Sequence, residues 1–162
     1  SAWLYRHAEE YGMDEERLFV SGHSAGAHLT AMMMAALWPV YDAQLPKDLF
    51  KGGLAVSGIY DLLPLVQIGF LNADLRLDEA QANKVSPAFL PPATRAPLYT
   101  CVGGAESSEF RRQNALIAQR WRSAVAGDIA MPGHNHFSVI DELANPESAL
   151  FAGAKRMMKL DR

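Results

Sequence analysis

The chain has 162 residues, of which 49% are hydrophobic and 20% charged, and this balance indicates one globular domain with a real core. Its net charge of −3 provides no basic surface for nucleic acid and no polybasic segment for a membrane. The sequence shows neither a signal peptide nor an apolar stretch near the ~20 residues of a membrane span. We therefore expect a small-molecule partner and a cytoplasmic location, and a homodimer is left open.

The beginning of the chain predicts a helix, a strand and a second helix. Apolar residues repeat at helical spacing over residues 3–11, and Gly12 is suited to end that helix. Residues 18–20 (Leu-Phe-Val) predict a short buried strand. Residues 25–38 predict a helix rich in Ala, Met and Leu, which Pro39 ends.

Strands and helices alternate along the rest of the chain. Strands are predicted at 53–57, 98–102 and 128–131, and helices at 109–125 and 145–160. The single cysteine, Cys101, is expected to be buried in a strand. This alternation predicts an α/β fold over residues 1–162, with a mostly parallel sheet and helices on both faces. In such sheets the ligand site lies at the carboxyl ends of the strands.

The segment 62–92 breaks this alternation. It combines many apolar side chains with several prolines and a glycine. Since these residues interrupt long helices, the segment predicts short helices packed as a lid-like insert, rather than a separate domain.

The most informative motif is Gly-His-Ser-Ala-Gly at 22–26, between a predicted strand and a predicted helix. This context predicts a nucleophile elbow, with Ser24 on a sharp turn and its Oγ exposed at the end of the sheet. We expect a Cβ at Gly22 or Gly26 to collide where the chain reverses. The backbone N–H of Ala25, the residue after the nucleophile, is the expected oxyanion donor.

A serine nucleophile needs a base, and the base needs a carboxylate that fixes its tautomer. Glu106 is the preferred carboxylate, because it follows the predicted strand 98–102 at the carboxyl end of the sheet. Glu109 is expected to serve the start of a helix instead, and Asp128 opens a strand at the opposite end. Asp61 is expected to cap a helix.

Five histidines compete for the role of base. His134 and His136 share the loop after the last predicted strand, and spacing alone does not choose between them. His7 is expected on an exposed helix face, His23 to point away from the site, and His28 to be packed one turn after the serine. A metal site at the His-x-His pair is disfavoured, because the loop lacks companion ligands at metal-binding spacing.

Several stretches together carry a family resemblance: residues 19–29, 57–65, 86–87, 102–113 and 135–137. They resemble the arylformamidases (kynurenine formamidases), in the hormone-sensitive-lipase-like branch of the α/β-hydrolase superfamily. The resemblance implies the α/β-hydrolase fold, of which this chain would supply the C-terminal half with the last four strands. It also implies hydrolysis of N-formyl-L-kynurenine to kynurenine and formate in tryptophan breakdown, with no metal or cofactor.

Residue by residue, the resemblance makes Ser24 the nucleophile, Glu106 the acid and His136 the base. It favours His136 over His134 because the histidine of the family directly precedes a phenylalanine. Many relatives have aspartate at the acid position; glutamate keeps the charge and adds one methylene. The His-Gly-Gly oxyanion motif of the family lies upstream of the elbow and is missing from this sequence.

This departure predicts that the chain is the C-terminal part of a longer enzyme. The first residues already look like the middle of a helix, and Ser1 is not an initiator methionine. We also expect the first strand to be an unpaired, apolar edge.

The substrate is the least determined property, because the insert 62–92 would shape the pocket. A carboxylesterase of other specificity and a non-catalytic hydrolase-fold fragment are the alternatives. Tyr60, Phe70 and Phe137 are candidate contacts to an aromatic substrate.

Overall fold

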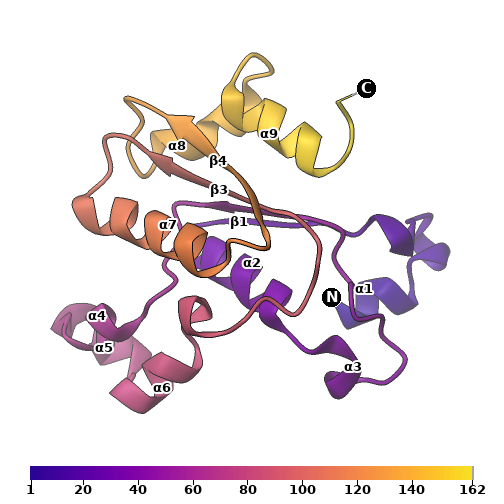
Figure 1. Cartoon of the computed structure of the whole chain (residues 1–162), viewed down its shortest axis with the longest axis horizontal. Helices are drawn as coiled ribbons and strands as arrows, with labels where there is room; N and C mark the ends of the chain where they lie inside the picture. The colour runs from indigo at the N-terminus through magenta and orange to yellow at the C-terminus, as the bar shows by residue number, and fades with distance from the viewer. Residues whose placement is uncertain (162) are drawn as a thin grey trace.

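The computed structural model describes residues 1–161, which form a four-stranded parallel sheet between two layers of helices (Figure 1). The strands are β1 (Val20–His23), β2 (Gly53–Val56), β3 (Leu98–Gly103) and β4 (Val125–Met131), in that order across the sheet. The longest helices are α2 (Ala25–Ala35), α7 (Ser108–Arg120) and α9 (Ala149–Met157). The shorter helices are α1 (Ala2–Arg6), α3 (Trp38–Tyr41), α4 (Leu63–Val66), α5 (Gly69–Leu75), α6 (Glu79–Lys84) and α8 (Ser138–Asp141). Four 3₁₀ turns complete the chain: η1 (Glu9–Tyr11), η2 (Glu15–Arg17), η3 (Pro87–Phe89) and η4 (Glu142–Ala144).

Each face of the sheet has its own core. Leu54 and Val56 of β2 face a cluster that includes Cys101 and Leu150 of α9. Ala55, between them, faces the opposite cluster, which α2 and α7 complete. Successive side chains of a strand point to opposite faces, so β2 is buried on both sides. Figure 1 shows α8 and α9 over one face and α2 and α7 over the other.

The α/β class and the parallel sheet expected from the sequence are confirmed, and Cys101 is fully buried in β3. In the described residues β1 lies at one edge of the sheet and pairs only with β2. None of the helices within residues 1–161 has the length and apolar character to cross a membrane.

The bounds of three early elements differ from the prediction. The helix expected over residues 3–11 is the short helix α1 followed by the turn η1, and Gly12 ends that turn. The first strand is Val20–His23 rather than 18–20, because the polar residues after Val20 pair with the buried strand β2. The second helix ends at Ala35 rather than residue 38. Pro39 lies within the first turn of the separate helix α3, where a missing N–H costs little.

The C-terminal bounds differ as well. β4 begins at Val125, where a helix was predicted. Burial alternates along this strand, but its small residues Ala and Gly give no alternation of apolar and polar side chains in the sequence. Asp128 therefore lies inside the strand instead of opening it. The last helix begins after Ser148, whose side chain accepts a hydrogen bond from the Phe151 N–H, and not at residue 145.

The segment 62–92 contains the short helices α4, α5 and α6 and the turn η3. Ser86 anchors it, because its hydroxyl accepts from the Leu62 N–H at 2.8 Å and donates to the Ala82 carbonyl at 2.7 Å. The imidazole of His28 contacts the Val85 carbonyl at 2.7 Å, which links the segment to α2.

Candidate active site

Ser24 occupies a strained turn directly after β1. Its backbone has φ 58° and ψ −116°, a left-handed conformation that costs a residue other than glycine about 1–3 kcal/mol. The N–H of Ser24 donates to the Val56 carbonyl at 2.9 Å, so the end of β2 holds the turn in place. This is the geometry expected for a nucleophile elbow.

The two glycines of the motif have different surroundings. A Cβ on Gly22 would overlap the backbone carbonyl of Gly26, as the sequence predicted. A Cβ on Gly26 would meet no atom within 4 Å, so the predicted collision there is wrong. The backbone of Gly26 approaches the Cα of Gly22 closely. This approach requires that Gly22 has no side chain, but it does not require the same of Gly26.

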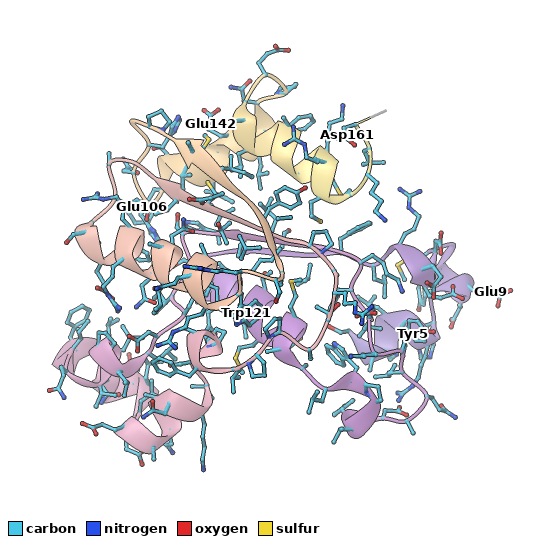
Figure 2. All side chains as sticks on the ribbon, viewed as in Figure 1. Tyr5, Glu9, Glu106, Trp121, Glu142 and Asp161 are labelled. Atoms are coloured by element: carbon cyan, nitrogen blue, oxygen red, sulfur yellow. The ribbon has the colours of Figure 1, made fainter. Side chains whose placement is uncertain are left out.

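Three side chains from distant segments meet at the carboxyl end of the sheet. The Nε2 of His136 lies 3.0 Å from the Oγ of Ser24, and its Nδ1 lies 2.7 Å from the Oε2 of Glu106. Ser24 joins β1 to α2, Glu106 lies between β3 and α7, and His136 follows β4. Figure 2 shows Glu106 near the start of α7 and far from Glu9, which lies at the other side of the molecule. The structure thus brings together the three residues that the sequence singled out.

The carboxylate of Glu106 is held from both sides. Its side chain is fully buried, and its Oε1 accepts from the Ser57 hydroxyl at 2.5 Å and from the Gly103 N–H at 2.7 Å. These two donors direct Oε2 at His136 Nδ1. A carboxylate at Nδ1 favours the tautomer whose Nε2 accepts a proton from Ser24. Sequence reasoning missed this role of Ser57, whose hydroxyl comes from the end of a different strand.

Aromatic rings surround the imidazole of His136. The ring of Phe110 lies 4.2 Å from it between centroids, that of His23 4.6 Å, and that of Phe137 5.6 Å and edge-on. The Nε2 of His23 also contacts the backbone carbonyl of His136 at 2.7 Å, where its N–H can donate. The expectation that His23 points away from the site is therefore wrong, because the loop after β4 folds back over the end of β1.

The rival carboxylates are engaged elsewhere. Asp128 accepts from Thr100 at 3.0 Å and from Asn114 at 2.8 Å. Asp61 accepts from the Leu63 N–H at 3.1 Å just before α4, but Leu62 and not Asp61 occupies the N-cap position that the sequence predicted for it. Glu109 accepts from the guanidinium of Arg112, which lowers the pKa of this carboxyl.

The candidates for substrate contact and oxyanion binding lie in different environments. Tyr60 is 0% exposed and part of the core, so its ring offers no surface to a substrate, and burial raises its pKa. Phe70 on α5 and Phe137 are 78% and 79% exposed. Ala25 is the first residue of α2, where the backbone N–H has no acceptor within the helix.

His134 contributes its backbone rather than its ring to the described contacts. Its carbonyl accepts from the Ala105 N–H at 3.0 Å, which ties the loop after β4 to the loop of Glu106. In the part of the chain that the structure describes, no three His, Cys, Asp or Glu side chains gather as a metal centre would require.

Comparison with known proteins identifies the family. Residues 2–95 match the family model BD-FAE. The chain belongs to the BD-FAE family. This BD-FAE chain is 34% identical to a kynurenine formamidase of Salmo salar over 151 residues. The aligned region covers 87% of this chain and 49% of that protein. A kynurenine formamidase of Danio rerio is also 34% identical, over 137 residues, with coverage of 79% and 45%. The BD-FAE chain therefore spans about half the length of the curated relatives it matches.

A solved structure shares the fold of this BD-FAE chain. A protein of Silicibacter sp. tm1040 that is described as a thioesterase superposes with a TM-score of 0.74 at 28% identity. The match covers 92% of this chain and 55% of that protein. The α/β-hydrolase fold that the sequence implied is thus confirmed, with part of that fold present here.

Proposed function

We propose that this BD-FAE chain carries the catalytic residues of a serine hydrolase that cleaves the formyl amide of N-formyl-L-kynurenine in tryptophan breakdown. The products are kynurenine and formate. The observation that carries the proposal is the hydrogen-bonded line from Glu106 through His136 to Ser24. The identity to kynurenine formamidases along most of the chain supports the choice of substrate.

In the first half of the reaction, the Oγ of Ser24 attacks the formyl carbonyl carbon, and Nε2 of His136 takes the hydroxyl proton. The negative charge that develops on the carbonyl oxygen is stabilised by the N–H of Ala25. Glu106 and the face of the Phe110 ring stabilise the imidazolium, since a cation within about 6 Å of a ring centroid is attracted to it. Collapse of the tetrahedral intermediate breaks the C–N bond, and His136 returns its proton to the leaving amine.

In the second half, a water molecule attacks the formyl ester on Ser24. His136 takes a proton from this water, the ester bond to Oγ breaks, and formate leaves. His136 then returns the proton to Oγ, which restores the free enzyme. Every proton transfer uses the same nitrogen, Nε2, 3.0 Å from the serine oxygen.

A carboxylesterase with the same catalytic residues is the second candidate. It is supported by the structural relative described as a thioesterase, because ester and amide hydrolysis use the same acyl-enzyme chemistry.

The two functions can be separated by kinetics on the natural full-length protein. We expect kcat/KM for N-formyl-L-kynurenine to exceed kcat/KM for phenyl acetate, and Ser24→Ala to abolish both reactions. A preference for the ester would favour the carboxylesterase, and a Ser24→Ala variant with unchanged turnover would contradict both proposals.

A further inference from the structure

An apolar pocket of about 260 Å³ lies between α5 and the beginning of α7. Its apolar walls come from two stretches that are far apart in the sequence, residues 59–71 and 107–113. The first stretch runs from the loop after β2 through α4 and α5, and the second is the beginning of α7; the apolar side chains are Ile59, Leu65, Ile68, Leu71 and Phe110. The pocket is therefore formed by the fold and not by one local stretch.

The pocket and the proposed catalytic residues share a wall. Phe110 lines the pocket, and its ring lies 4.2 Å from the imidazole of His136, with an angle of 33° between the two planes. Ser107, which also lines the pocket, directly follows Glu106 in the chain. Phe110 thus contacts both the pocket and the imidazole of His136.

The amide of Gln113 and the carboxylate of Glu109 at the rim already have hydrogen-bond partners. The amide oxygen of Gln113 accepts from the N–H groups of Tyr60 and Asp61, and its nitrogen donates to the Asp61 carbonyl and to Glu109. These four hydrogen bonds use the full capacity of the amide. Both oxygens of Glu109 accept from Arg112. A charged ligand group would lose its water here and find both of these side chains already engaged, which disfavours its binding.

We infer that this pocket binds the single uncharged aromatic ring of an N-formylarylamine or aryl ester substrate, with Phe110 between that ring and the catalytic imidazole. The inference rests on the proposed function and adds the part of the substrate that this surface recognises. A cavity of about 150 Å³ suffices for benzene, so the observed volume accepts one substituted ring. The charged amino-acid end of N-formyl-L-kynurenine stays outside, in water.

Two leucines on α5 provide a matched test. Leu71 lines the pocket and is 38% exposed, whereas Leu75 is 50% exposed on the same helix and lies outside the pocket lining. Leu71→Trp should fill the pocket, and Leu75→Trp adds the same side chain elsewhere. Equal melting temperatures of the two variants would establish that both are folded.

We expect Leu71→Trp to lower kcat/KM for formanilide about tenfold, mainly through KM, and to change kcat/KM for methyl formate less than twofold. Leu75→Trp should change neither. Equal losses on both substrates, or equal losses in the two tryptophan variants, would overturn the inference.

A binding measurement separates this inference from the proposed function. In the Ser24→Ala background, ligand-detected NMR should show that Leu71→Trp weakens formanilide binding about tenfold and that Leu75→Trp does not. If Ser24→Ala abolishes turnover while Leu71→Trp leaves binding unchanged, the pocket assignment alone fails. If Ser24→Ala keeps its turnover while Leu71→Trp weakens binding, the serine mechanism alone fails.

Discussion

The two ends of the parallel sheet differ in what they offer a ligand. The amino end has the larger cavity, about 610 Å³, lined by residues such as Arg17, Lys51 and Met158. The carboxyl end has the smaller apolar pocket of about 260 Å³ together with Ser24 and His136. The proposed catalytic residues therefore lie at the end with less open volume.

The difference follows from the polarity of the strands. In a parallel sheet, the loops that leave the carboxyl ends lie side by side, so residues from distant segments can converge there. At the amino end Lys51 already has partners, since its ammonium lies 2.9 Å from Glu16 and donates to the Asp48 carbonyl. The proposed site thus follows the direction of the strands and not the volume of the cavities.

The largest effect should come from the base at the carboxyl end. His136→Ala is expected to lower kcat for N-formyl-L-kynurenine by about 10⁴-fold or more, because Ser24 loses its proton acceptor. His134→Ala is the matched control, since only the backbone of His134 joins the described hydrogen bonds, and should cost far less. The opposite ranking in steady-state kinetics would assign the role to His134.

A smaller effect should follow from loosening the acid. Ser57→Ala removes the hydroxyl that donates to Glu106 Oε1, while the Gly103 N–H remains. The loss of a hydrogen bond to a charged group costs about 1.5–3 kcal/mol, so we expect kcat to fall roughly tenfold to a hundredfold. Because alanine at φ 53° is no more strained than serine, a thermal melt should separate this effect from unfolding. Unchanged kcat would show that Ser57 does not position Glu106.

The smallest effect is expected at the amino end. Lys51→Ala removes the ion pair with Glu16, which is largely exposed, and should reduce the free energy of unfolding by at most about 1 kcal/mol. The value of kcat/KM should stay within twofold of the unmodified protein. A tenfold loss of kcat/KM would indicate a functional site at the amino end of the sheet, which contradicts a site at the carboxyl end.

The sequence predicted residues that follow strands, because their position depends on local signals. Ser24 lies in a short motif between strand and helix, and Glu106 follows a strand in the order expected for the fold. The loop after the last strand was also predicted to hold the base, but only the family resemblance favoured His136 over His134. The sequence also predicted the layered α/β architecture, since apolar strands and amphipathic helices alternate. The predicted bounds were wrong where pairing with a neighbouring strand outweighed the local pattern, as at Val125, which pairs with Leu98.

The supporting contacts could not be predicted, because each joins segments that are remote along the chain. The hydroxyl of Ser57 meets Glu106 across 49 positions, and the ring of His23 meets the His136 carbonyl across 113. The sequence also could not predict which aromatic side chains lie near the proposed site. Tyr60 was a candidate, but it is buried in the core, whereas the ring of Phe110 lies beside the imidazole of His136.

The central claim is that Ser24 is a nucleophile activated by His136 at the carboxyl end of the sheet. Its most direct test is labelling of the natural full-length protein with a fluorophosphonate, followed by peptide mass spectrometry to locate the adduct. We predict a single adduct on the Oγ of Ser24, with labelling slowed at least a hundredfold in His136→Ala and absent in Ser24→Ala. An adduct on another residue, or labelling that persists in Ser24→Ala, would contradict the claim.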